Sequence, residues 1–546
     1  MRRFSRVVLA AALVLGVAIA LPSHAASGYK GFVNEHAYVA TPVGNIYVQY
    51  WRPTDPAVKV PVILSISPYR YLYARLDPRA PITDTYSDRY VPRGYARAYA
   101  DLVGTGLSDG CYNYGGKNEA IANAAVIEWL GTRPWTNGKI GMIGTSYDGA
   151  TQLEAATLAP KHLAAIVPQE PVSIWYHYNY DHGVLYNGSD EKTENVDQTG
   201  YPVGTPDLFD FVLGRTPNTD PGLTPAQRVA NLQWRLQECG DISHEAKGHG
   251  AQTEYDAFWQ ERDWALRADK VTAAVLYQQG WDDNNTKSQQ FQRFFDHLTH
   301  AADKRAIAGQ WVHTDVFDGG AAASHWPIVR LDYLDAYFSH WLKGAPASVL
   351  DGFPKILSEG SDKQFRTTLP FGVKRTVTAL PTQAARFTNT GAETSMVIHE
   401  TGSLPNSPNY WVSELKPVSA DSRLTGIGKI MVTASSTGLR GQLDAALVDV
   451  DSAGAASVIC VGLSDLRYRN NPAVGQDLSP GKAFSASVSL TPQDYILKAG
   501  HHFAIVLSGS NLVWGVSDPE AGQVVTIAKA TLSLPVLAAK LNILEP

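Results

Sequence analysis

A serine flanked by small residues is the strongest chemical signal in this sequence. Ser146 lies in the segment Gly-Thr-Ser-Tyr-Asp-Gly, residues 144–149, between the apolar run 139–143 and a stretch with helical apolar spacing. A sharp turn from strand to helix needs small residues beside the serine, and backbone N–H groups at the helix N-terminus can bind an oxyanion. Glycine-rich turns are more often structural, but this strand-turn-helix context predicts a nucleophile.

Groups that could activate Ser146 follow two later apolar runs. Asp282 and Asp283 come after residues 271–277, and His313 comes after residues 305–307. In α/β-hydrolases the nucleophile, acid and histidine occur in this chain order, on loops after strands of one sheet. We therefore expect Asp283 to orient His313, and His313 to accept the proton of Ser146. Spacing alone does not distinguish Asp283 from Asp282, and single loop carboxylates or histidines are usually solvated or structural.

The order of apolar and polar segments predicts the elements that position these residues. Strands and helices alternate up to about residue 170 and again after residue 271, and the helix expected near the end of this region covers residues 328–342. Between them, residues 171–269 lose the alternation, and beyond residue 353 short alternating runs are separated by turn-forming residues. The fold class is therefore α/β: an α/β-hydrolase core with a helical cap insertion, followed by an all-β jelly-roll domain. The expected divisions are a signal peptide at 1–25, the core at 28–170 and 271–346, the cap at 171–270 and the β-sandwich at 350–546.

The N-terminus predicts export. Three arginines precede the apolar run 7–21, and Ser23, His24 and Ala25 supply a small-residue cleavage site. About fifteen apolar residues are fewer than the roughly twenty that span a bilayer, so a membrane anchor is the weaker alternative. We expect the mature protein to be extracellular or periplasmic, with no membrane association after signal cleavage.

The charge composition argues against nucleic acid as a partner. A net charge of −6 and a pI near 6.2 give no basic field for nucleic acid. A peptide or small acyl substrate is expected, and a homo-oligomer is left open. Cys111, Cys239 and Cys460 have no paired short spacing, so zinc is not suggested. A mechanism based on Ser146 and His313 needs no metal or organic cofactor, and none is expected. A Cys111–Cys239 disulfide and three buried thiols are both compatible with the sequence.

The residues around the proposed triad resemble the family that joins X-prolyl dipeptidyl aminopeptidases, cocaine esterase and α-amino acid ester hydrolases. The family's G-x-S-Y-x-G pattern matches residues 144–149, and its triad acid and histidine occupy loops like those of Asp283 and His313. The resemblance implies an oxyanion hole formed by the Tyr69 hydroxyl, after Pro68, and the Tyr147 N–H. It covers nearly all of the mature chain.

Two segments are most similar to the X-prolyl peptidases: the aromatic stretch 172–178 and the acid loop 283–287. The resemblance implies substrate contacts from Trp175, Tyr178 and Asn285, and an amino-binding carboxylate at Glu191. The run around Glu191 is polar enough for a solvated surface group. The expected activity is release of N-terminal Xaa-Pro dipeptides through an acyl-enzyme. The alternatives are a carboxylic ester hydrolase or acylase of the cocaine-esterase type and, from another class, an inactive binding protein.

Overall fold

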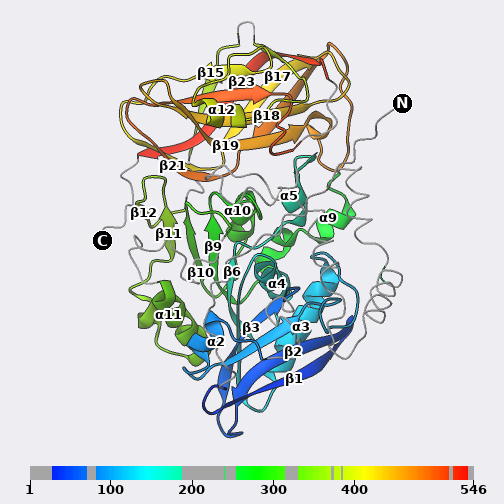
Figure 1. Ribbon diagram of the computed structural model, residues 1–546, viewed down its shortest axis with the longest axis vertical. Helices are drawn as coiled ribbons and strands as arrows, with labels where there is room; N and C mark the ends of the chain where they lie inside the picture. Colours follow the sequence, from blue (N-terminus) through cyan, green and yellow to red (C-terminus); the bar gives the residue numbers. More distant parts are fainter. Residues whose placement is uncertain are drawn as a thin grey trace, which may run out of the picture.

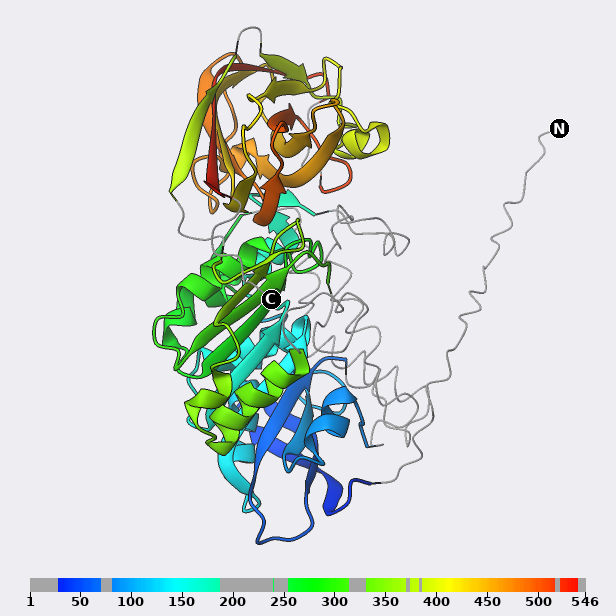
Figure 2. The ribbon, with the colours of Figure 1, turned by 90° about the vertical axis from the view of Figure 1, so that its left-hand side faces the viewer.

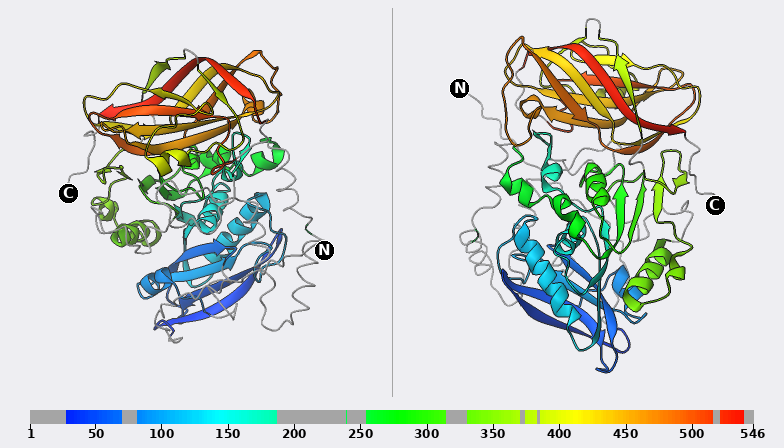
Figure 3. Two further views of the ribbon diagram at one scale, coloured as in Figure 1. Left: turned by 45° about the horizontal axis from the view of Figure 1, so that its top comes forward. Right: turned by 180° about the vertical axis from the view of Figure 1, so that it is seen from behind.

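The computed structural model describes residues 28–69, 81–186, 239, 254–313, 330–369, 374–382, 385–515 and 521–538. An α/β body and a β-sandwich lie end to end along the long axis of the molecule (Figure 1). The side view and the view from behind show the same arrangement (Figures 2 and 3). The predicted signal peptide, most of the predicted cap, and Glu191 lie outside the described residues.

A ten-stranded sheet forms the centre of the α/β body, in the order β1-β2-β4-β3-β5-β6-β9-β10-β11-β12. The strands from β4 to β11 run parallel, whereas β1, β2 and β12 pair antiparallel with their neighbours. In chain order the strands are β1 Phe32–Thr41, β2 Gly44–Pro53, β3 Val60–Ser67, β4 Ala96–Asp101, β5 Thr136–Thr145, β6 Leu163–Gln169, β9 Ala274–Gly280, β10 Lys304–Gly309, β11 Ile356–Glu359 and β12 Phe365–Arg366. The carboxyl ends of the parallel strands therefore meet at one edge of the sheet.

Helices cover both faces of this sheet, which explains why its central strands are apolar throughout. On β3, Val62 and Leu64 pack into the hydrophobic cluster that holds one set of helices, and Ile63 packs into the cluster on the opposite face. The first set is α3 Lys117–Gly131, α4 Tyr147–Ala156 and α10 Gln289–Asp296, and the second is α2 Thr85–Tyr90 and α11 Arg330–Lys343. None of the described helices is both long and apolar enough to cross a membrane.

The described parts of the predicted cap, residues 171–186, 239 and 254–270, contain short elements. These are α5 Trp175–Asn179, the paired strands β7 Tyr180–Asp181 and β8 Val184–Leu185, α9 Ala257–Glu261 and the 3-10 helix η2 Trp264–Lys270. Tyr176, Tyr180 and Trp259 pack against one another and join α5, β7 and α9. These described segments therefore form one aromatic layer beside the core.

The predicted all-β region is confirmed as two antiparallel sheets with a common hydrophobic core. One sheet has the order β20-β17-β23-β16-β21, with β13 and β14 also paired to β23, and the other has the order β15-β22-β18-β19. Its elements are β13 Arg375–Leu380, β14 Arg386–Thr388, α12 Met396–Thr401, β15 Trp411–Glu414, β16 Ser422–Gly426, β17 Lys429–Ser436, β18 Gln442–Val450, β19 Ala456–Asp465, β20 Ala483–Ser489, β21 Gln493–Leu497, β22 His502–Ser508 and β23 Val524–Ala538. Ile430 of β17 and Leu447 of β18 belong to the same buried cluster, so the sheets face each other as a sandwich.

The sandwich begins later than the predicted residue 350. β11 and β12 follow that residue, but they extend the central sheet: Ile307 of β10 pairs in parallel with Leu357 of β11. The short alternating runs that begin after residue 353 therefore start with two edge strands of the central sheet. The first strand of the sandwich is β13.

Candidate active site

Ser146 occupies a strained turn between β5 and α4. Its backbone has φ 63° and ψ −123°, a conformation that non-glycine residues rarely adopt, and its N–H donates to the Gln169 carbonyl at 2.9 Å. A Cβ added to Gly144 would lie 2.5 Å from the Cβ of Asp148, and one added to Gly149 would lie 2.9 Å from the Gln169 carbonyl oxygen. Both glycines are therefore needed for close packing. Gly149 comes one residue later than the second glycine of the commoner G-x-S-x-G pattern, and it packs against the end of β6.

His313 and Asp283 meet at the carboxyl edge of the sheet, after β10 and β9. Their Nδ1 and Oδ2 atoms are 3.1 Å apart. Asp283 is held in turn by its own loop: Oδ1 accepts from the backbone N–H groups of Asn285 and Thr286, and Oδ2 accepts from the Thr286 hydroxyl at 2.6 Å. A buried carboxylate with this many donors can fix the tautomer and orientation of the imidazole, as a triad acid must.

The strand register brings these loops toward Ser146. Thr145 on β5 pairs with Gln169 on β6, Gln169 pairs with Gln278 on β9, and Gly280 of β9 pairs with Gly309 of β10. The nucleophile, acid and histidine loops therefore leave β5, β9 and β10, three of four consecutive strands, at the same level. No hydrogen bond joins the Ser146 hydroxyl to His313 among the described residues, and such catalytic hydrogen bonds often tighten only in the substrate complex.

Glu170 is a second carboxylate at His313 that sequence reasoning missed. Its Oε2 atom lies 3.2 Å from Nδ1 of His313, and its Oε1 accepts a hydrogen bond from Trp311 at 2.7 Å. Glu170 follows β6 directly, so a signal was present: like Asp283, it is a carboxylate at the carboxyl end of a parallel strand. The polar groups of Glu170, Asp283 and His313 lie within 4.8 Å of one another. The two contacts to Nδ1 account for this spacing, and we assign no metal to them.

The two carboxylates change the acidity of the histidine. Burial by itself would lower the pKa of His313, but the charges and hydrogen bonds of Asp283 and Glu170 outweigh it and raise that pKa to about 10. Burial likewise opposes ionisation of Asp283, yet the attraction and hydrogen bond of His313, with the Thr286 contacts, lower the pKa of this carboxyl. The pair is therefore arranged to stabilise an imidazolium ion beside a carboxylate.

Tyr147 is placed to offer its backbone N–H and not its side chain. It is the first residue of α4, where N–H groups have no partner within the helix, while its buried hydroxyl donates to Oε2 of Glu119 at 2.9 Å. The Tyr69 ring lies edge-on to the Tyr147 ring, with centroids 6.2 Å apart, and the Tyr69 N–H is fixed by Ser67 Oγ at 3.0 Å. Both residues of the predicted oxyanion hole thus lie on the Ser146 side of the sheet.

The predicted aromatic contacts are buried beside the nucleophile helix. The Trp175 ring has its centroid 4.9 Å from that of Tyr147 and 5.8 Å from that of Tyr178, and both Trp175 and Tyr178 are almost fully enclosed. Lys287 donates from Nζ to the Tyr178 carbonyl at 2.9 Å, and burial lowers the pKa of its ammonium group to about 7. This lysine therefore connects the acid loop to the aromatic layer.

Asn285 is the predicted substrate contact nearest to the acid. Its N–H is held by Asp283, but its side-chain Oδ1 is buried and has no hydrogen-bond partner among the described residues. An unpaired buried amide oxygen can accept a hydrogen bond from a bound ligand.

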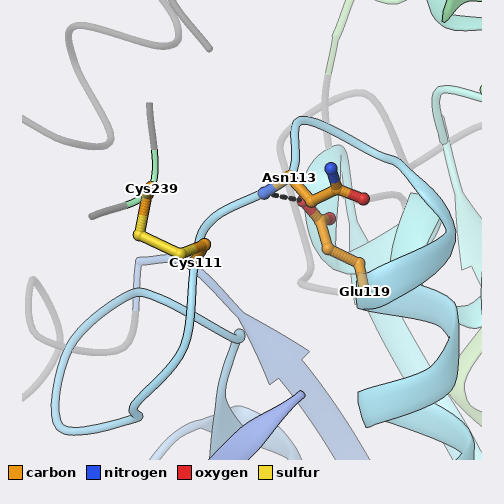
Figure 4. Close-up of a disulfide and its surroundings, with 4 residues drawn as sticks. All are labelled: Cys111, Asn113, Glu119 and Cys239. Atoms are coloured by element: carbon orange, nitrogen blue, oxygen red, sulfur yellow. Dashed lines mark hydrogen bonds between the residues drawn. A yellow bond between two sulfur atoms is a disulfide. The ribbon is translucent and has the colours of Figure 1, made fainter. Parts of the chain in front are cut away.

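Cys111 and Cys239 form a disulfide across 128 residues (Figure 4). Cys239 lies within the predicted cap, and Cys111 lies in the loop that leads to α3. Two residues further along this loop, the Asn113 N–H donates to Oε1 of Glu119 at 3.1 Å, and Glu119 is the carboxylate that holds Tyr147. The disulfide therefore anchors the insertion to the loop that supports the start of α4.

Cys460 is the remaining cysteine, and it is a free thiol buried in the sandwich. Burial raises the pKa of this thiol well above its usual range, as expected for an inert structural cysteine.

Sequence comparisons agree with this architecture. A profile of the X-Pro dipeptidyl-peptidase (S15 family) matches residues 45–315, and a profile of the X-Pro dipeptidyl-peptidase C-terminal non-catalytic domain matches residues 213–529. The chain is 25% identical to a Bacillus cereus protein with a provisional Xaa-Pro dipeptidyl-peptidase name, over 93% of this chain and 91% of that protein. A similarly named Streptomyces avermitilis protein is 28% identical, over 92% and 83%. The solved structure of an α-amino acid ester hydrolase superposes with a TM-score of 0.71 at 16% identity, covering 96% of this chain and all of that one, which supports the fold.

Proposed function

Because the chain belongs to the X-Pro dipeptidyl-peptidase (S15) family, we propose that it releases N-terminal Xaa-Pro dipeptides through an acyl-enzyme on Ser146. The protein is an enzyme of the serine hydrolase type, and the proposal concerns its substrate and its intermediate. The observation that carries it is the contact of 3.1 Å between His313 Nδ1 and Asp283 Oδ2, at the same edge of the sheet as the strained Ser146. This geometry supports nucleophilic catalysis by Ser146.

In the proposed reaction the Ser146 oxygen attacks the carbonyl carbon of the proline residue while Nε2 of His313 accepts the hydroxyl proton. The oxyanion is stabilised by the Tyr147 N–H and the Tyr69 hydroxyl. The carbon–nitrogen bond then breaks, and the imidazolium returns the proton to the departing amine. Water, deprotonated by His313, attacks the ester and releases the dipeptide with the serine hydroxyl restored.

Recognition of a free amino terminus is the part of the proposal that separates a dipeptidyl-peptidase from an endopeptidase. Asn285 Oδ1 supplies one buried acceptor beside the triad acid. Glu191, the carboxylate implied by the family resemblance, would supply the opposite charge for an ammonium group. Trp175 and Tyr178 are almost fully enclosed, so in this proposal they support the wall of a proline pocket from behind.

A carboxylic ester hydrolase on the same scaffold is the second candidate. The triad geometry does not choose between an amine and an alcohol leaving group, because the surrounding pocket determines which substrate is bound. In this chain Asn285 and Thr286 stand where the family resemblance places the acidic pair of α-amino acid ester hydrolases, so a simple ester without an amino group is the form of this alternative that we favour.

We also propose that the protein acts outside the cytoplasm. The basic and apolar N-terminus supports export, and a disulfide between Cys111 and Cys239 is stable in oxidising compartments.

Hydrolysis of Gly-Pro-p-nitroanilide by the mature protein tests the substrate. We expect cleavage of the free-amino compound, no cleavage of its N-acetylated form, and no activity in the S146A variant. Cleavage of a simple acyl ester but of neither anilide, with Ser146 still required, would establish the esterase instead.

A further inference from the structure

Glu170 and Asp283 approach the same nitrogen of His313 from two different strands. Nδ1 of His313 lies 3.2 Å from Glu170 Oε2 and 3.1 Å from Asp283 Oδ2, and both carboxylate side chains are fully buried. An Nδ1–H group has one proton to donate, so these carboxylates either share it or alternate as its acceptor. A single triad acid leaves the second contact unexplained.

The backbone holds Glu170 firmly in this place. Its N–H donates to the Gln278 carbonyl of β9 at 3.0 Å, and Trp311 donates to the carboxylate atom that does not face His313. Its φ of 45° is positive, as is that of Ser146. Strained conformations of non-glycine residues persist where the surrounding structure enforces them, and they concentrate in active sites.

The topology explains how two acids can serve one histidine. β6 lies between β5, which carries the nucleophile, and β9, which carries Asp283. Glu170 leaves β6 at the same edge of the sheet, one strand nearer to the nucleophile strand than Asp283 does. Trp311, two residues before His313, completes the arrangement by binding Glu170 directly.

We propose that Glu170 is a second acid of the triad: a positioning residue that shares the Nδ1–H of His313 with Asp283. It acts through His313 and makes no contact with the substrate. It keeps Nε2 directed toward Ser146, adds a second negative charge to stabilise the imidazolium, and retains a carboxylate at Nδ1 when Asp283 is lost. This inference rests on the proposed role of His313 as the base for Ser146.

The charges around His313 set the direction of the expected effect. Asp283 and Glu170 both favour the protonated imidazole, whereas burial of the ring opposes it. The Lys287 ammonium interacts with the charge of Asp283. Removing the charge of Glu170 must therefore make His313 easier to deprotonate. A buried glutamate that served only to stabilise the fold would leave the titration of the base unchanged.

The rate at which a fluorophosphonate labels Ser146 tests this inference without assuming any natural substrate. It should be measured from pH 5 to pH 10.5 for the mature wild type, E170Q, D283N, E170Q/D283N and H313A. E154Q is a matched control, because Glu154 is equally buried on α4 but has no hydrogen bond or ion pair with His313 among the described residues.

We expect the acid limb of the E170Q profile to move about one pH unit or more toward acid, and that of E154Q to stay in place. At the pH optimum, D283N should label at least about tenfold faster than the double variant, because Glu170 still orients the imidazole. The second-acid role would be overturned if the acid limb of the E170Q profile stayed in place. It would also be overturned if D283N and the double variant labelled at equal rates.

Further measurements distinguish failure of this inference from misfolding and from failure of the proposed function. If E170Q does not fold, judged by circular dichroism and its unfolding temperature, D283N is compared with H313A, and equal labelling rates would overturn the inference. A wild type that labels at Ser146 but cleaves no Xaa-Pro anilide would refute the proposed substrate and leave the role of Glu170 intact. A wild type that does not label would refute the triad itself.

Discussion

Asp282 and Asp283 are neighbours in the chain, yet their carboxylates serve different domains. Oδ2 of Asp283 lies 3.1 Å from Nδ1 of His313, whereas Oδ1 of Asp282 accepts a hydrogen bond from Gln493 of β21 at 3.0 Å. Burial raises the pKa of Asp282 to about 7, and attraction to His313 helps to lower that of Asp283. The acid loop therefore carries one carboxylate for the active site and one for the contact with the sandwich.

This division predicts opposite phenotypes for two isosteric variants. D283N should lower kcat/KM by about two to three powers of ten with little loss of stability, because the imidazole loses its main orienting charge. D282N should keep kcat/KM within about threefold and lower the unfolding temperature by a few degrees at most, because it changes one hydrogen-bonded group at the domain contact. Kinetics and thermal unfolding of both variants check this, and a larger kinetic loss in D282N would reverse the assignment.

The pH dependence follows from the shifted pKa of His313. The base must be neutral to accept the Ser146 proton, and the two carboxylates raise its pKa from the usual 6.5 to about 10. The fraction of active base should therefore keep rising well above pH 7.5, where an unperturbed histidine would already be about nine-tenths deprotonated. The rate should be measured with an activated ester that has no amino group. The amino group of a peptide substrate titrates near pH 8 and would obscure the titration of His313. A plateau below pH 7 would contradict the raised pKa.

The sequence predicted the order of elements well, but strand ends were harder to place. The strand expected at residues 271–277 runs instead from Ala274 to Gly280, because Gln278 and Gln279 continue it although they are polar. Both glutamines are buried, and the Gln278 carbonyl accepts from Glu170 in the site. Hydropathy cannot mark the end of a strand whose last residues turn polar to form a catalytic site.

The choice of acid shows a second limit. Asp282 and Asp283 follow the same strand, so spacing could not separate them, and only the direction of each side chain does. Glu170 could not be singled out from the sequence, because the expected chain order needs only one acid and the loop after residues 271–277 already supplies it. The N-terminal hairpin of β1 and β2 was not predicted either: β1 is partly exposed and mixes polar with apolar residues, so its alternation is weak.

Tyr69 gives a direct test of the oxyanion hole. Y69F removes one hydroxyl and keeps the ring that packs beside Tyr147. We expect kcat to fall about 100- to 1000-fold with little change in KM, because the donor acts where charge develops in the transition state. Y95F is the matched control, since Tyr95 is buried against the opposite helix layer beside Lys343 and should have no effect on kcat. A loss below about threefold in Y69F would assign the second donor to another group.

The disulfide predicts that the redox state of Cys111 and Cys239 affects the reactivity of Ser146. Alkylation of the denatured protein should modify one thiol, Cys460, before reduction and all three cysteines afterwards. Closing a loop of 128 residues restricts the unfolded chain, so C111S/C239S should reduce the free energy of unfolding by about 2 to 5 kcal/mol. Because the Cys111 loop also leads to the contacts of Glu119 with Tyr147, the variant should label more slowly at Ser146 even at temperatures where it remains folded. Unchanged labelling in a folded but less stable variant would show that the disulfide stabilises the chain without supporting the active site.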